Sequence, residues 1–330
     1  MNPFDWPPAV WSTVLAFIIL NVTLLIAAYS IWFERKFAGA LQNRPGPTEV
    51  GPFGLLQPIA DLVKLLQKED IVPNDADRKL FFLAPPLAAI LSVVVLAVVP
   101  VGPGLIVADL DIGFIFVLAI GSVMVIPMWM AGWSSNNKYA LLSAMRSASQ
   151  SVSYEIPLLL SAMVPVILTG SFKLTDIVAA QAGYNWFVFW PPGPGIFAFF
   201  LFFVCSLAEA NRIPFDIPEA ESELISGVTV EYTGMKFGLI QLAEYVHTLV
   251  TSALCALVFL GGWEGPGPDG VHWFLAKTLL IFGLIFWLRW SLMRYRWDQL
   301  MRICWVYFVP ASLILVAVAA LWRFYMGGVS

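Results

Sequence analysis

The chain has 330 residues, of which 59% are hydrophobic and only 12% carry a charge. Soluble domains carry about 25% charged residues, so a soluble fold of this length would expose too much apolar surface to water. The composition therefore predicts an all-α integral membrane protein with lipid around most of its surface. The small net charge of −4 and the lack of a basic stripe argue against nucleic acid as a partner.

Apolar runs recur along the whole chain. A helix needs about 20 apolar residues to cross the hydrocarbon core. Good candidates for spans are residues 10–33, 80–101, 113–132, 156–170, 237–260, 273–292 and 303–325. The first follows an N-terminus without basic residues, which favours a span over a cleaved signal. An eighth run, residues 195–208, is short and follows the proline-rich WPPGPG, so it needs an independent test.

The basic residues provide that test. With eight spans, all but three of the 18 lysines and arginines fall on one side of the membrane. The three on the other side are Lys173, Lys277 and Arg323. If residues 195–208 are not a span, several arginines move to the other side of the membrane, and the difference in basic residues between the two sides becomes smaller. Because basic residues concentrate on the inside, the sequence predicts about eight spans with both termini outside.

The sequence predicts a single membrane domain, residues 1–330, whose unusual parts are its inside loops. These are residues 34–79, 133–155, 209–236 and 289–302. In the first loop, apolar residues recur at helical spacing at Leu55, Ile59, Leu62 and Leu66. Asp61 and Lys64 occupy the opposite face, so we expect an amphipathic helix. It would lie in the membrane interface or pack against another subunit, and the pattern leaves both alternatives open.

The third inside loop is rich in carboxylates. It contains Glu209, Asp216, Glu219, Glu221, Glu223 and Glu231, against only Arg212 and Lys236. Clustered carboxylates raise one another's pKa, which allows proton exchange near neutral pH. A solvated acidic loop is the simpler explanation. The prolines and apolar residues between the carboxylates favour a packed, structured loop instead.

Glu244 lies inside the apolar run 237–260, where an ionised side chain is costly and usually functional. It belongs to a stripe of side chains at helical spacing, namely Gln241, Glu244, Thr248, Thr251 and Cys255. This stripe is expected to face the interior of the bundle, either as a hydrogen-bond seam or as part of a proton path.

Two motifs carry a resemblance to a known family. PFDIPEAESELISG, residues 214–227, resembles the signature loop of the H-subunit family of respiratory complex I, also called the NADH dehydrogenase subunit 1 family. ERKFAGALQNRPGP followed by GLLQPIADLVKLLQKE is similar to that family's first signature. One departure is Leu62, where the family usually has a smaller residue. The motifs occur in the family's order, and the resemblance covers essentially the whole chain.

The resemblance implies a membrane subunit of a proton-pumping NADH:quinone oxidoreductase that helps to bind quinone and couples its reduction to proton translocation. This chain would bind no cofactor or metal; quinone would be the substrate, with FMN and iron–sulfur clusters in partner subunits. Its partners would be peripheral-arm subunits next to the terminal cluster, other membrane-arm subunits and lipid. The membrane would be a bacterial plasma membrane, or an organellar inner or thylakoid membrane.

The resemblance also implies roles for individual residues. The quinone chamber and coupling loop would use Glu34, Arg35, Arg44, Asp61, Lys64, Arg212, Asp216, Glu219, Glu221, Glu223 and Glu231. The proton path would use Glu155, Glu209 and Glu244. Two alternatives remain open from the sequence. One is the related subunit of a ferredoxin-linked quinone reductase or membrane-bound hydrogenase, and the other is a stand-alone transporter, against which the lack of internal repeats counts.

Overall fold

A computed structural model describes residues 7–183, 185–190, 194–218 and 225–327. Within these ranges the chain forms helices and no strand, which confirms the predicted all-α class. The helices are α1 (Pro8–Leu41), η1 (Pro52–Gly54), α2 (Gln57–Gln67), α3 (Arg78–Val94), η2 (Val95–Ala97), α4 (Gly113–Val123), α5 (Val125–Ser134), α6 (Lys138–Thr169), α7 (Leu174–Ala179), α8 (Pro194–Glu209), η3 (Gly227–Thr229), α10 (Gly234–Phe259), α11 (Val271–Ser291), α12 (Trp297–Arg302), η4 (Ile303–Phe308) and α13 (Val309–Gly327).

In the part of the chain that the structure describes, 7 helical stretches are long and apolar enough to cross a membrane. They correspond to the seven long apolar runs of the sequence. The main difference lies in α6, which begins at Lys138, so most of the expected inside loop 133–155 is helical. The side-chain oxygen of Asn137 accepts a hydrogen bond from the backbone N–H of Tyr139 and caps this helix. A polar cap can therefore start a helix well before its apolar run begins.

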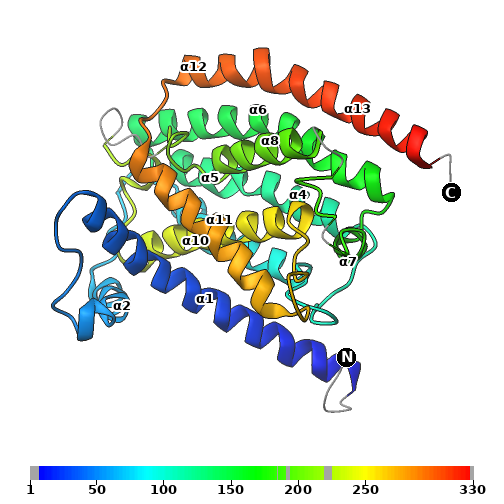
Figure 1. The fold of residues 1–330 in the computed structure, drawn as a ribbon. Helices are drawn as coiled ribbons and strands as arrows, with labels where there is room; N and C mark the ends of the chain where they lie inside the picture. Colours follow the sequence, from blue (N-terminus) through cyan, green and yellow to red (C-terminus); the bar gives the residue numbers. More distant parts are fainter. Residues whose placement is uncertain (1–6, 184, 191–193, 219–224, 328–330) are drawn as a thin grey trace.

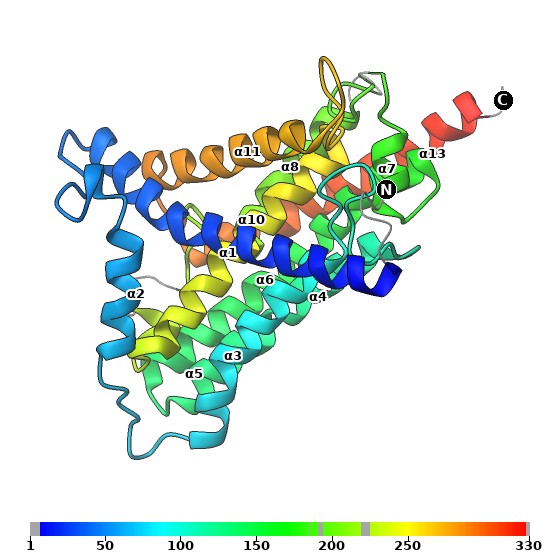
Figure 2. The same cartoon turned by 90° about the horizontal axis from the view of Figure 1, so that it is seen from below.

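The short apolar run forms α8, which has 16 residues and packs along α6 (Figure 1). At 1.5 Å per residue it is about 24 Å long. The start of α1 and the end of α13 lie at the same end of the bundle (Figures 1 and 2). An odd number of crossings would put them at opposite ends, so this arrangement supports α8 as the eighth span.

Helix α10 is the central element of the bundle. It packs against α1, α2, α3, α8 and α11, and 89% of the residues in its most apolar stretch are buried. Thr248, Thr251 and Cys255 are at most 4% exposed, so the polar stripe faces the interior as the sequence predicts. A polar stripe on a fully surrounded helix can reach side chains from several neighbouring helices.

Helix α2 stands across the inner end of α1 (Figure 2). Its apolar face is exposed, including Leu62, so the larger residue at this position displaces no neighbour. The chain after α2 is tied to the start of α10, because the backbone N–H of Ile71 donates to Thr233 Oγ1 (3.1 Å). Lys236 Nζ also lies 2.9 Å from Asp70 Oδ2. These contacts fix the amphipathic helix relative to the central span.

Candidate functional site

The inner end of α1 is joined to α2 by an ion pair. Arg35 Nη1 lies 2.8 Å from Asp61 Oδ2, and Gln57 Nε2 donates to Asp61 Oδ1 (3.0 Å). Lys64 Nζ lies 4.0 Å from the same carboxylate. The Arg35 side chain is 49% exposed, so this pair contributes at most about 1 kcal/mol to stability. Its main effect is to set the position of α2 against α1.

Glu34 points the other way, into the bundle. Its carboxylate lies 2.6 Å from Arg289 Nη1 on α11, and Tyr245 on α10 donates its hydroxyl to it at 2.6 Å. The Glu34 side chain is 6% exposed and that of Arg289 is 19% exposed. Buried charges are tolerated where they are paired and hydrogen-bonded. Glu34 and Arg35, although consecutive in α1, therefore contact two different groups: Glu34 contacts α10 and α11, and Arg35 contacts α2.

Arg212 extends this cluster into the membrane. It is 3% exposed, its guanidinium lies 4.5 Å from the centre of the Tyr245 ring, and its Nε donates to Thr248 Oγ1 (3.4 Å). A guanidinium over an aromatic face is attracted by the electrons of the ring. Tyr245 thus touches Glu34 with its hydroxyl and Arg212 with its face, and links α1 to the polar stripe of α10.

A second group of carboxylates lies deeper in the bundle. Glu209, at the end of α8, and Glu244 line one cavity of about 30 Å³ together with His247, whose Nε2 is 3.9 Å from Glu209 Oε1. Glu155 on α6 accepts a hydrogen bond from the Ser122 hydroxyl on α4. All three proton-path residues expected from the sequence are therefore side chains within the helix bundle.

Room for the Glu209 carboxylate comes from Gly121 on α4. A methyl group at this glycine would overlap Oε1 of Glu209. The carboxylate can approach the α4 backbone only because Gly121 has no side chain. Gly121 and Ser122 are thus consecutive residues that accommodate two different carboxylates.

The acidic loop is only partly described. Glu219, Glu221 and Glu223 lie outside the described residues. The preceding segment is packed as expected: Gln150 Nε2 on α6 donates to the backbone oxygens of Ala208 and Phe215, both at 2.8 Å. Asp216 is 8% exposed.

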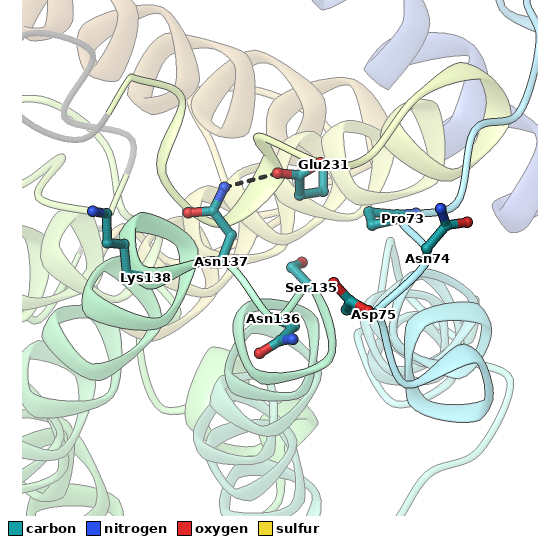
Figure 3. A pocket seen from close by; sticks show the side chains of 8 residues that line it. All are labelled: Pro73, Asn74, Asp75, Ser135, Asn136, Asn137, Lys138 and Glu231. Carbon is teal, nitrogen blue, oxygen red and sulfur yellow. Dashed lines mark hydrogen bonds between the residues drawn. The ribbon is translucent and has the colours of Figure 1, made fainter.

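Glu231 lies apart from the buried carboxylates, in a polar depression of about 420 Å³ that Figure 3 shows with its lining side chains. It accepts a hydrogen bond from Asn137 Nδ2 (2.7 Å), and Asp75 and Lys138 also line the depression. Next to this depression, burial raises the pKa of Tyr232 to about 12, against a smaller lowering by its hydrogen bond with Ser134.

Arg44 lies outside both groups of charges. It is exposed beyond the end of α1, and no carboxylate within the described ranges lies within ion-pair distance of it. Within the described residues, Arg44 therefore forms no ion pair with the other residues expected at the chamber.

Four residues of these clusters have no signal in the sequence pattern beyond their residue type. The sequence assigns Arg289 only to the positive inside, and it gives Tyr245, His247 and Gly121 no role. Arg289 and Tyr245 meet Glu34 only because α10 and α11 pack beside α1. The step from Glu244 to His247 is three residues, which places both on neighbouring faces of one helix.

Known proteins resemble this chain along nearly its whole length. Residues 14–320 match the family model described as NADH dehydrogenase. The chain is 47% identical to the NADH-quinone oxidoreductase H subunit of Dehalococcoides mccartyi (strain CBDB1), over 94% of this chain and 87% of the relative. It is 46% identical to an NADH-quinone oxidoreductase H subunit of Geobacter metallireducens, over 91% of this chain and 93% of the relative.

A third relative, the NADH-quinone oxidoreductase H subunit of Thermomicrobium roseum, is 43% identical over 97% of this chain and 98% of its own length. Such identity across nearly complete chains shows that the likeness is not confined to a shared motif. The chain therefore belongs to the H-subunit family of NADH-quinone oxidoreductase, which its two loop motifs indicate.

Proposed function

We propose that this chain forms part of the quinone chamber of its complex and carries a path of charged groups from that chamber into the membrane. The observation that carries this proposal is the continuity of the buried polar groups. Glu34 contacts Tyr245, Tyr245 contacts Arg212, and Arg212 contacts Thr248 on the stripe that holds Glu244. A lipid-facing bundle has no structural need for such a series of buried charges.

At the chamber end, Arg35, Asp61 and the Glu34–Arg289 pair supply fixed charges and hydrogen-bond donors at the inner ends of α1, α2 and α11. A quinone presents two carbonyl oxygens that accept hydrogen bonds, and its reduction consumes two electrons and two protons. Iron–sulfur clusters and FMN in partner subunits would supply the electrons. The residues of this chain would orient the quinone head group and hold the charge that develops on it.

Coupling to proton movement would be electrostatic. Two unit charges 4 Å apart interact by about 4 kcal/mol at an effective dielectric constant of 20. A change of charge at Glu34 or on the quinone is therefore large enough to change the protonation of a neighbouring buried group. Each change would in turn favour a proton shift at the next member of the series, from Glu244 to Glu209 and Glu155.

Peripheral-arm subunits would dock next to the depression around Asp75 and Glu231, on the side that the basic residues predict to be inside (Figure 3). The bacterial sources of the relatives favour a bacterial plasma membrane. Mass spectrometry of the subunits that co-purify with this chain tests both the partners and the electron donor. An NADH-oxidising flavoprotein supports the proposal, whereas a hydrogenase or ferredoxin-binding subunit contradicts it.

Glu244→Gln and Glu209→Gln, each made in the assembled complex, are expected to lower quinone-coupled turnover about tenfold or more. The amide keeps the size of the side chain but cannot take up or release a proton. Oxidation of NADH by an artificial acceptor at the flavin should stay unchanged, because that reaction does not need the membrane path. Asp269→Asn, an exposed carboxylate at the outer side, is the matched control. Wild-type turnover and proton translocation in both glutamine variants would contradict the path.

Glu219→Gln and Glu221→Gln test the acidic loop separately. We expect lower quinone reductase activity while the iron–sulfur clusters are still reduced by NADH, because electrons reach the terminal cluster without passing through this chain. The measurement is turnover together with the cluster signals in electron paramagnetic resonance. Unchanged turnover in both variants would remove the loop from the mechanism.

A further inference from the structure

His247 is a buried titratable side chain to which the proposed path assigns no task. It lies on α10 and is 7% exposed. Its Nε2 has no hydrogen-bond partner among the described residues, yet it lies 3.9 Å from Glu209 Oε1 on α8. That distance is too long for a direct hydrogen bond. A buried ring nitrogen without a partner costs free energy unless something else satisfies it.

The cavity beside this nitrogen is suited to water. It measures about 30 Å³, and Glu209, Glu244 and His247 line it together with Ser147, Ser151 and Asn211. A site holds a water molecule when it offers at least about 10–15 Å³ and two to four polar partners. This cavity meets both conditions. Because both glutamates and the histidine line this one cavity, we expect a single water molecule in it to contact all three.

Charged groups of opposite sign surround the imidazole. Glu244 precedes it by one helical turn on α10, and Glu209 faces it from α8 with Glu155 of α6 beyond. Arg212 follows α8 and is held by Thr248, the residue after His247. The carboxylates attract a proton to the ring and the guanidinium repels it.

We propose that His247 relays protons between Glu244 and Glu209 through water in this cavity. The inference rests on the proposed path and adds the group that bridges its gap. Protonated Glu244 gives its proton to the water, which passes one of its own protons to Nε2 of the neutral imidazole. The imidazolium then returns the Nε2 proton to the water, which passes one of its protons to the Glu209 carboxylate. At the end Glu244 is ionised, Glu209 is protonated, and the imidazole and the water are unchanged.

The test compares His247→Gln and His247→Phe in the assembled complex with His272→Gln as the control. His272 is the other of the two histidines and is exposed at the outer side. We expect both His247 variants to lose about tenfold in quinone-coupled turnover, a loss that is modest for a group that transfers protons. The pH profile of proton translocation should also lose an ionisation that the wild type and His272→Gln retain. Oxidation of NADH by an artificial acceptor should be equal in all four.

Wild-type turnover and pH profile in His247→Gln overturn the relay. A loss confined to His247→Phe also overturns it. In that case the position needs only a side chain that does not exclude water from the cavity, and no proton passes through the imidazole. These outcomes are separate from failure of the path itself. Active Glu244→Gln and Glu209→Gln variants contradict the path, whereas inactive carboxylate variants beside normal His247 variants leave the path standing without the relay.

Discussion

Arg289→Ala is expected to lower quinone reduction at least about tenfold and to lower the free energy of unfolding by about 3–5 kcal/mol. The reason is the buried partner that it leaves behind. Glu34 is 5% exposed and would keep the Tyr245 hydroxyl but lose the only cation within ion-pair distance of it in the described structure. The measurements are quinone reductase activity and the thermal unfolding midpoint of the purified complex.

Two further variants separate stability from activity in this cluster. Arg296→Ala is the control, since Arg296 pairs with Asp298 at an exposed position and such pairs contribute about 0–1 kcal/mol. The double variant Glu34→Gln with Arg289→Met removes both charges and should recover most of the stability. It should not recover activity, because the chamber wall is then neutral. Full activity in the double variant would contradict a role of this ion pair in the chamber.

Gly121→Ala is expected to reduce quinone-coupled proton translocation about tenfold, comparable to Glu209→Gln. The added methyl group would overlap the Glu209 carboxylate and push it away from α4. A misplacement of about 1 Å can cost up to 100-fold in rate. The change itself favours the helix, because alanine is better than glycine by about 1 kcal/mol in a helix interior. If coupling is lost while the helix keeps its stability, the loss is therefore due to the displacement of the Glu209 carboxylate.

Gly283→Ala is the matched control for this variant. Gly283 lies within α11, and no atom lies within 4 Å of the position of an added methyl group. Both variants are measured in sealed membrane vesicles as the number of protons translocated per NADH oxidised. Equal coupling in Gly121→Ala and Gly283→Ala would show that the carboxylate does not need its place beside α4.

Much of the fold follows directly from the sequence. Apolar runs of sufficient length must be helical in lipid, because each backbone polar group needs a partner within the chain. The amphipathic helix α2 and the inward face of the α10 stripe also follow, since helical periodicity places residues three and four apart on one face. Hydropathy does not locate the start of α6, because residues 138–155 are mostly polar or small and could equally form a loop.

Composition and periodicity are enough to establish a membrane protein whose charged groups gather in inside loops and in one polar span. Composition and periodicity are properties of each segment by itself, so they determine whether that segment is a span or a loop and which of its faces is polar. Which charges meet is settled by the packing of the helices. Glu34 and Tyr245 are 211 residues apart, and they form a hydrogen bond only because α1 and α10 pack together. Likewise, His247 faces Glu209 across a cavity only where α10 and α8 come together. Such pairings depend on the relative placement of helices, which no pattern within a single segment records.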